Sequence, residues 1–439
     1  MTTLFIANDI DESLWIRGDS RAWSQRALWM IQPGDSVILP AEADELFLQS
    51  VCDAKGFNSA EVTIVRAPEG RYGQKVLDPI ALLRPDFIAK IRSLADGTVS
   101  VFPLFPSASL MPFLEELRLE GCLPGAGFIG QSGGNTANSK AFFRAIAVSQ
   151  EVPIVKGYVA YSRAEAQLFL ERIMATSSAA VVKRSHSGAG AGNQLVTSRA
   201  IDRSRAGLRS QYELTGNSST EIQQYLDDRW EWASHDGRYP VVIERFADPQ
   251  ESFYIEYLVE EDGPTLLGTG TLHYVDSLIQ REEADVIPQI LDARQRQKVM
   301  SHAARLGRAY YNVGYRGIAC FDALIDAEGD VMFTECNART TTGTHLHWGI
   351  KPLVDGQTTL EQYTSPHHLP HLSTDKVLGV LRTLGLHFDQ ASGAGILLTM
   401  PPSPDPAIPG FLYACVNTTE NERHEFLAGI EAAVALQGS

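Results

Sequence analysis

Apolar positions in the first 130 residues alternate between short continuous runs and stripes with helical spacing. The runs predict four strands, at residues 4–7, 37–39, 62–65 and 99–102. The clearest helical stripe contains Leu110, Phe113, Leu114 and Leu117, and Gly121 ends the helix. Strands that alternate with helices predict an α/β domain with a mainly parallel sheet, covered on both faces.

The pattern changes after residue 120. A connection rich in Gly, Ser and Asn spans residues 121–139, and helices are predicted at 137–150 and 163–174. From residue 179 onward, alternating apolar positions predict antiparallel strands, with a polar helical excursion at 203–238 and a helix at 294–310. A hairpin follows at 318–339. Residues 374–436 predict a helix, two strands and a helix, so this part of the chain is predicted as α+β with a small αββα appendix.

Composition and charge narrow the range of partners. Of the 439 residues, 44% are hydrophobic and 21% charged, as in an ordinary globular protein. Lys and Arg number 37 and Asp and Glu 53, so the net charge of −16 repels phosphate backbones and no nucleic-acid partner is expected. Three prolines interrupt the longest uncharged stretch, 97–114, so no membrane association is expected. Five cysteines without C-x-x-C spacing fit free thiols and a cytoplasmic location.

Three familiar motif types give weak signals or none. Residues 125–130 match G-x-G-x-x-G, but a dinucleotide fingerprint leaves a strand and opens a helix, and Pro124 precedes this segment. No G-x-x-x-x-G-K-[ST] sequence is present. The histidines at 345–347 and 367–371 could suggest a zinc hydrolase, but packed or solvated histidines are the favoured interpretation, because zinc needs three or four convergent ligands.

The glycine-rich loop at 187–192 is more informative. It lies between two predicted strands, and Lys183 precedes it at the end of the first strand. A strand, a flexible glycine loop and a second strand can form a flap whose backbone N–H groups close over phosphates, with Lys183 beside them. A plain glycine turn is the alternative.

The hairpin at 318–339 carries the strongest signal. A turn near Glu328 and Gly329 places Asp322 opposite Glu335. Glu335, Asn337 and Arg339 alternate along one strand, so they share one face. Two carboxylates and a carboxamide on one face predict a Mg²⁺ site, and the neighbouring arginine indicates phosphate. An exposed strand face with a salt bridge is the alternative.

A further segment fits between these two. Glu244, Arg245 and Phe246 end a predicted strand, and Glu251 follows shortly before the next strand. Backbone groups that leave a strand can read the edge of an adenine, and a nearby carboxylate can accept hydrogen bonds from a ribose. By itself this arrangement is generic.

In their order along the chain, these pieces resemble the ATP-grasp superfamily. The resemblance rests on SKAFFRAIAVSQEVPIVKG at 139–157, VVKRSHSGAGAGN at 181–193, VIERF at 242–246, FDALID at 321–326 and FTECNAR at 333–339. It implies a Rossmann-like pre-ATP-grasp domain at 1–135 and an ATP-grasp domain at 136–372 whose two subdomains clamp ATP. The αββα appendix would then occupy 373–439.

The resemblance also implies a role for each matching residue. The nucleotide would contact Lys140, Lys183, Ser187, Gly188, Ala189, Gly190, Gly192, Glu244, Arg245, Phe246 and Glu251. Asp322, Glu335 and Asn337 would hold Mg²⁺, with two ions expected and Mn²⁺ able to substitute. Arg339 and Lys183 would act on the phosphate and the acyl-phosphate. Cys320 stands where some D-alanine ligases have arginine, so Arg316 or Arg339 would supply that charge.

Within the superfamily, TLFIAND at 3–9, ECNARTTTGTHLHWG at 335–349 and the predicted tail are similar to the peptide-ligase branch typified by the pheganomycin peptide ligase. This implies an ADP-forming ligase that activates the carboxylate of a non-proteinogenic amino acid as an acyl-phosphate. The acyl group would be coupled to the amine of a peptide or amino acid, in antibiotic or other secondary-metabolite biosynthesis, with a homodimer as one compatible assembly. The alternatives are an ATP-grasp carboxylase, another carboxylate–amine ligase, or a non-catalytic nucleotide-binding module.

Overall fold

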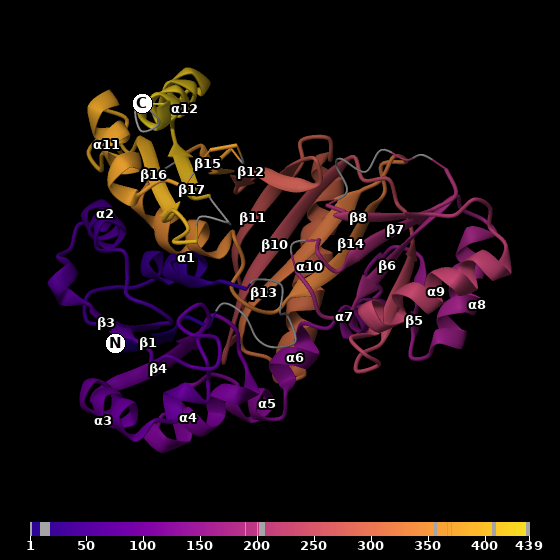
Figure 1. The fold of residues 1–439 in the computed structure, drawn as a ribbon, viewed down its shortest axis with the longest axis horizontal. Helices are drawn as coiled ribbons and strands as arrows, with labels where there is room; N and C mark the ends of the chain where they lie inside the picture. The colour runs from indigo at the N-terminus through magenta and orange to yellow at the C-terminus, as the bar shows by residue number, and fades with distance from the viewer. Residues whose placement is uncertain are drawn as a thin grey trace.

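The computed structural model describes residues 2–8, 18–188, 190–199, 201, 207–354, 358–366, 368–369, 371–405 and 410–435. Its strands form three sheets, of four, eight and five strands. Figure 1 shows the eight-stranded sheet in the centre, the four-stranded sheet at the lower left and the five-stranded sheet at the right. Within the described residues, no helix combines the length and apolar character that crossing a membrane requires.

The N-terminal sheet is wholly parallel, in the order β3-β2-β1-β4, as predicted. Its strands are β1 (Thr2–Ile6), β2 (Ser36–Leu39), β3 (Thr63–Arg66) and β4 (Thr98–Pro103), with helices α1 (Arg21–Ser24), α2 (Glu45–Lys55), α3 (Pro85–Leu94) and α4 (Met111–Leu117). Leu4 and Ile6 pack on one face with Phe87 and Phe113. Phe5 packs on the other face, against C-terminal elements, which explains the continuous apolar run of β1.

The connection at 121–139 folds into two short helices, α5 (Ala126–Gly130) and α6 (Gly133–Ala137). The G-x-G-x-x-G segment follows a 3₁₀ turn rather than a strand, so it lacks the context of a dinucleotide fingerprint. Gly134 is required for close packing, because a Cβ atom there would lie 1.6 Å from the carbonyl oxygen of Pro106.

The five-stranded sheet, with the helices on it, forms what we call the lid subdomain (residues 157–245). Its strands, in the order β5-β9-β6-β7-β8, are β5 (Gly157–Ala160), β9 (Val241–Arg245), β6 (Ala179–Arg184), β7 (Asn193–Thr197) and β8 (Ser210–Glu213). Helices α8 (Arg163–Met174) and α9 (Ser219–Ser234) pack on one face of this sheet. The helical excursion predicted at 203–238 is confirmed in part, since α9 lies within it, but strand β8 also lies within it and pairs in parallel with β7.

The central sheet has the order β14-β13-β10-β11-β12-β15-β17-β16, and its neighbouring strands are antiparallel. Its strands are β10 (Glu251–Glu260), β11 (Gly263–Val275), β12 (Leu278–Ala284), β13 (Gly317–Ile325), β14 (Val331–Asn337), β15 (Leu360–Thr364), β16 (Gly395–Met400) and β17 (Leu412–Val416). Helices α7 (Lys140–Ser149) and α10 (Ala293–Asn312) cover one face of β10 and β13, where Leu306 and Tyr310 pack against Phe253 and Phe321. The other face of these strands is left for the site.

The C-terminal segment has the predicted αββα order, with helix α11 (Thr374–Leu384) before β16 and β17 in the chain and helix α12 (Glu420–Ala435) after them. Its two strands continue the central sheet through β15 rather than forming a sheet of their own. They also pack against the N-terminal domain, as Figure 1 shows at the upper left. The far edge of the central sheet is therefore built from both ends of the chain.

Candidate active site

The hairpin of β13 and β14 gathers the predicted metal ligands. Asp322 lies directly opposite Glu335, as predicted. The Asn337 amide nitrogen donates to Asp322 Oδ2 at 3.0 Å, and Arg339 Nη2 donates to Asn337 Oδ1 at 3.0 Å. All four side chains line one cavity. A β-bulge between Asp322 and Ala323 sets the register, because it leaves one extra residue on β14.

Lys140 joins this group from the first turn of α7. Its Nζ lies 2.6 Å from Glu335 Oε2 and donates to the carbonyl oxygen of Ser187 at 2.9 Å. Burial is the largest single influence on Glu335 and raises its pKa, but the charge and hydrogen bond of Lys140, the charge of Lys183 and the hydrogen bond of Asp322 together outweigh it and lower that pKa to about 2. Burial, and then the Glu335 charge, raise the pKa of Asp322 well above its usual range.

A second charged cluster lies where the lid subdomain meets the hairpin. The buried Glu244 carboxylate forms two ion pairs. Lys183 Nζ lies 2.5 Å from it, and Arg144 of α7 is its second partner. Lys183 and all three predicted hinge residues, Glu244–Phe246, line the cavity. The apolar wall here, which we call the nucleotide end, consists of Val155, Val181, Phe246, Ala247 and Leu324.

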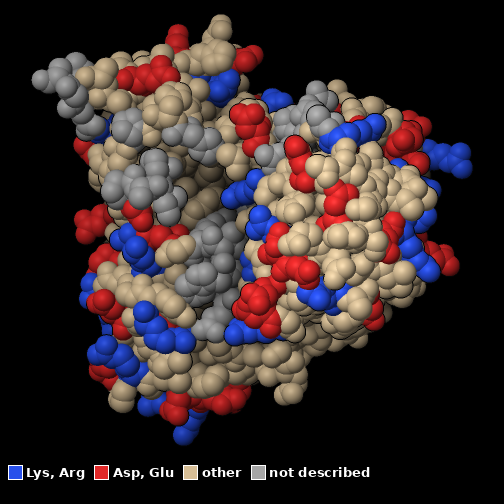
Figure 2. All heavy atoms as spheres, turned by 45° about the vertical axis from the view of Figure 1, so that its right-hand side comes forward, with Lys and Arg blue, Asp and Glu red and all other residues tan. Residues whose placement is uncertain are grey.

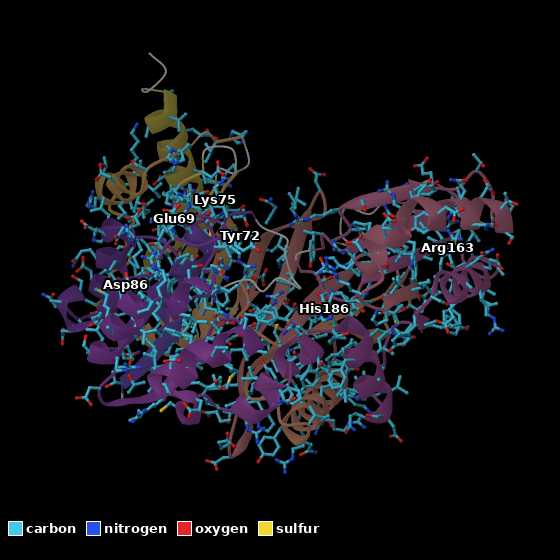
Figure 3. All side chains as sticks on the ribbon, turned by 60° about the horizontal axis from the view of Figure 1, so that its bottom comes forward. Glu69, Tyr72, Lys75, Asp86, Arg163 and His186 are labelled. Atoms are coloured by element: carbon cyan, nitrogen blue, oxygen red, sulfur yellow. The ribbon has the colours of Figure 1, made fainter. Side chains whose placement is uncertain are left out.

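The predicted flap is the loop between the antiparallel strands β6 and β7. Gly188 and Gly190 line the cavity, whereas Ser187 and Gly192 do not, and Ala189 lies outside the described residues. In Figure 3, His186 next to the flap lies between Tyr72 of the N-terminal domain and Arg163 of α8. Gly190 has a φ of +72°, and a Cβ there would lie 2.0 Å from the Gly207 carbonyl oxygen, so glycine is required.

A cavity of about 700 Å³ connects these parts. It lies between the lid subdomain and the central sheet and extends to the N-terminal domain and the C-terminal strands. Figure 2 shows Lys and Arg side chains along the edge of the lid that borders this groove. The wall opposite the nucleotide end, which we call the far end, includes Ala22, Trp23, Tyr363, Met400 and Leu412.

Lys140, Glu251 and Arg316, like Ser187 and Gly192, are predicted site residues that do not line this cavity. Glu251 begins β10, and the neighbouring Ser252 lines the cavity in its place. Arg316 lies before β13, where its Nε is 3.3 Å from Glu261 Oε2 and its guanidinium is 4.0 Å from the centroid of the Tyr311 ring. The ribose role of Glu251 and the catalytic role of Arg316 therefore gain no support here. Arg339 is the better placed of the two arginines.

The histidines near residue 346 are packed, as the favoured interpretation held. His345 Nε2 lies 2.8 Å from Gln362 Oε1, and His347 Nε2 lies 2.9 Å from the Tyr254 hydroxyl. Burial lowers the pKa of His345 to about 3 and that of His347 to about 4, so both are neutral. In the described part of the chain, no three His, Cys, Asp or Glu side chains cluster to hold a metal by themselves.

Sequence reasoning missed a polar row that crosses the same face of the central sheet. The Tyr254 hydroxyl donates to Glu282 Oε1 at 2.5 Å, and Gln362 Nε2 donates to Glu282 Oε2 at 3.4 Å. Arg26 lines the cavity beside the row and donates to the carbonyl oxygen of Thr341 at 2.8 Å. These residues come from separate strands and from the N-terminal domain, and no local motif joins them.

The donor set fits a hard divalent cation that is shared with phosphate. Asp322, Glu335 and Asn337 offer oxygen ligands, and Mg²⁺ typically takes one or two protein carboxylates and completes its shell with phosphate and water. Two buried polar atoms beside them, Arg339 Nε and Ser187 Oγ, have no hydrogen-bond partner in the described parts of the chain. Arg339 lines the cavity, so an anionic ligand there would supply a partner for its Nε, whereas Ser187 does not line it.

Comparisons with known proteins bear on the fold. Residues 24–119 match the family model described as Pre ATP-grasp domain. The chain is similar to N5-carboxyaminoimidazole ribonucleotide synthetase in its ADP complex, with a TM-score of 0.57, 10% identity and coverage of 99% of this chain and 97% of that one. It is also similar to biotin carboxylase from Campylobacter jejuni in a β,γ-ATP complex (TM-score 0.59, 14% identity, coverage 98% and 95%). A third similar structure is L-amino acid ligase from Bacillus licheniformis, with a TM-score of 0.50, 14% identity and coverage of 98% of this chain and 97% of that one.

No curated protein matches the chain in sequence. The structural similarities nevertheless confirm the predicted fold class, a Rossmann-like pre-ATP-grasp domain followed by an ATP-grasp fold. At these identities they show the fold alone. The peptide-ligase resemblance, the boundaries at 135 and 372 and the role of each site residue stay predictions.

Proposed function

We propose that the protein is an ADP-forming carboxylate–amine ligase. In this proposal it activates the carboxylate of an amino acid as an acyl-phosphate and joins it to the amine of a peptide or another amino acid. The observation that carries the proposal is the set of Asp322, Glu335 and Asn337 on one face of a hairpin, bordering a cavity beside Lys183 and Arg339. The ATP-grasp fold supports it, because a structure with this fold is described as an L-amino acid ligase.

The first step brings two anions together, because a carboxylate oxygen attacks the γ-phosphorus of ATP while ADP leaves. Lys183 and Arg339 stabilise the negative charge on the phosphates, and Lys140 holds Glu335 in place. When bound, Mg²⁺ or Mn²⁺ at Asp322, Glu335 and Asn337 supplies further charge neutralisation. Positioning of the two reactants in the cavity supplies much of the remaining rate enhancement.

The flap protects the acyl-phosphate from water. Gly188 and Gly190 lie at the cavity wall, and backbone N–H groups of such a loop can cover phosphates without a side chain intervening. Because acyl-phosphates hydrolyse, closing the site before the reaction favours transfer to the amine. A role in secondary metabolism and a homodimeric assembly complete the proposal.

A carboxylase is the second candidate, since two of the similar structures are described as an N5-carboxyaminoimidazole ribonucleotide synthetase and a biotin carboxylase. The decisive experiment is a mass-spectrometric screen of ATP-dependent coupling between amino acids and short peptides, with ADP and AMP distinguished. A ligase gives ADP and a new amide only when both substrates are present. ADP release that needs bicarbonate and no amino acid would support the carboxylase, and ATP binding without turnover would support a binding module.

A substitution tests the metal assignment in the same assay. We expect Glu335→Ala to abolish ADP formation while the protein stays folded, because a carboxylate ligand is lost. Glu328→Ala is the matched control, since Glu328 is exposed at the turn of the same hairpin. Near-normal turnover in Glu335→Ala would contradict the assignment.

A further inference from the structure

Glu282 occupies an unusual position in the polar row. Asp322 pairs with Tyr254 across β13 and β10, and Tyr254 pairs with Gly270 on β11. The Tyr254 ring lies over Gly270, where a Cβ would be only 2.5 Å from the ring atoms, and its hydroxyl reaches Glu282 on β12. Tyr254 and Glu282 thus share the cavity face with the metal-binding hairpin.

The charge of Glu282 is not matched by a direct partner. Glu282 is 1% exposed and lines the cavity, yet among the described residues it forms no salt bridge within 4.0 Å. Its hydrogen-bond partners, Tyr254, Gln362 and Thr342, are neutral. Burial raises the pKa of Glu282, and Tyr254, Gln362 and the nearby Arg26 oppose that rise.

Apart from Arg26, no described residue of the far end offsets the charge of Glu282. Asp19 also lines the cavity, but Arg21 neutralises it at 2.5 Å. A second buried carboxylate, Glu256, accepts hydrogen bonds from two threonines, and Arg26 is the cation that acts on both Glu256 and Glu282. Glu256 does not line the cavity. Among the described residues of the far end, the Glu282 carboxylate is therefore the anion that lacks a salt bridge, and it favours a positively charged ligand.

An apolar wall lines the same cavity as this carboxylate. Ala22 and Trp23 from the N-terminal domain pack against Met400 and Leu412 from the C-terminal strands, and all four line the cavity. Such a wall binds an apolar group by removing its surface from water. The far end therefore offers two complementary features, a buried anion and a hydrophobic surface.

We propose that the far end is the amine subsite, where Glu282 binds the ammonium of a hydrophobic amino acid or of a peptide with a hydrophobic first residue. The side chain of that residue lies against the wall of Trp23, Met400 and Leu412. This inference rests on the proposed function, because it assigns the ammonium as the nucleophile of the second step. It supplies the proton acceptor that sequence patterns do not reveal.

The step balances in protons and electrons. Glu282 takes one proton from the ammonium, and the nitrogen lone pair forms a bond to the acyl carbon. The bond between that carbon and the phosphate oxygen breaks, and the phosphate leaves with the second N–H proton. Three strand spacings, about 14 Å, separate β13 from β12, which leaves room for a phosphoryl group, an acyl carbon and an amine between Asp322 and Glu282.

Binding of simple amides tests the subsite without turnover. L-Phenylalaninamide is the probe, because its carboxylate is blocked, and calorimetry with the wild-type protein measures its affinity. We expect 3-phenylpropionamide, which lacks the ammonium, and glycinamide, which lacks the apolar side chain, to bind at least about tenfold more weakly. Equal affinity for 3-phenylpropionamide and phenylalaninamide would overturn the proposal with no variant needed.

A matched pair of variants assigns the effect to Glu282. Glu282→Gln keeps the shape and loses the charge, and we expect it to bind phenylalaninamide at least about tenfold more weakly. Glu283→Gln is the control, since Glu283 does not line the cavity and pairs with Arg281, and its affinity should stay at the wild-type value. Wild-type affinity in Glu282→Gln would refute the role of this residue.

Trapping with hydroxylamine separates this inference from the proposed function. Hydroxylamine is largely neutral near pH 7.5 and intercepts an acyl-phosphate without the ammonium site, so Glu282→Gln should lose much less hydroxamate formation, from the amino acid found in the coupling screen, than coupling to phenylalaninamide. The same variant should show a raised KM for phenylalaninamide. Equal loss of both reactions would contradict a role confined to the amine. Absence of hydroxamate in the wild-type protein would refute the proposed function and leave the binding result to decide the subsite.

Discussion

Replacement of Asp322 by Asn should separate metal binding from folding. Asp322 faces Glu335 across the hairpin, and two full charges about 5 Å apart repel by about 3 kcal/mol at an effective dielectric constant of 20. Burial and this repulsion hold the pKa of Asp322 well above its usual range, which favours the neutral carboxyl in the metal-free protein. Asn is neutral and has nearly the same shape. We therefore expect the free energy of unfolding without Mg²⁺ to change by less than about 1 kcal/mol.

The same variant should lose the functions that need a negatively charged ligand for Mg²⁺ at residue 322. Turnover of ATP should fall by a factor of about 10² to 10⁴, because coordination contributes several kcal/mol to the transition state. Urea unfolding with and without Mg²⁺ and ADP provides the second measurement. Ligand at a hundred times its Kd stabilises the wild-type protein by about 2.7 kcal/mol, and this increment should disappear in the variant.

Asp330→Asn is the control for this experiment, because Asp330 is exposed at the turn of the same hairpin. It should keep both the turnover and the stabilisation by Mg²⁺ and ADP. The reasoning is refuted if Asp322→Asn also keeps them. It is equally refuted if the variant loses several kcal/mol of stability in the absence of metal, since the carboxyl would then be charged in the free protein.

Three further substitutions test other parts of the site. Glu244→Ala should lower the free energy of unfolding in urea by about 3–5 kcal/mol, because it leaves two buried cations without their counter-ion. Gly270→Ala should displace the Tyr254 ring, lower the free energy of unfolding by about 1–3 kcal/mol and raise the KM for the amine. Gly379→Ala, in open space on α11, is the control and should neither lower the free energy of unfolding nor raise that KM. Burial raises the pKa of Glu256 from 4.5 to about 7, so the folded state binds this proton more tightly and its stabilising effect is lost as the pH rises from about 4.5 to about 7. Glu256→Gln should remove that loss, up to about 3 kcal/mol, and the difference between unfolding curves at pH 5 and pH 8 measures it.

The sequence predicts best where the signal is local. The four parallel N-terminal strands follow from continuous apolar runs, and Asp322 lies opposite Glu335 as hairpin arithmetic requires. The correct pairing of Asp322 with Glu335 depends partly on a β-bulge that offsets a register difference nearer the turn. Pairs next to the turn, such as Ile325 and Val331, sit one residue out of the predicted register, and the bulge beyond them restores it at Asp322.

Contacts between residues far apart in the chain could not be predicted from local sequence patterns. The polar row needs the strand order β13-β10-β11-β12-β15, which follows from packing of the whole sheet rather than from any local pattern. Strand β8 was missed because its four residues, Ser210–Glu213, are mostly polar and pair only at an edge. Arg316 was proposed to supply the charge that is missing because Cys320 stands where some D-alanine ligases have arginine, yet a side chain before a strand can point to either end of the sheet. In this fold it contacts Glu261 and Tyr311 instead.

The wall formed by Ala22, Trp23, Met400 and Leu412 has a consequence for how the protein is made. A nascent chain exposes its residues to folding in order, from the N-terminus onward. The groups proposed for ATP and metal are all synthesised by residue 339, whereas the wall needs Leu412 on β17. Before the last strands are synthesised, the nascent chain can therefore assemble the groups proposed for ATP and metal but not the apolar wall of the far end. Competence to select an amine should arise only when translation of the final strand has ended.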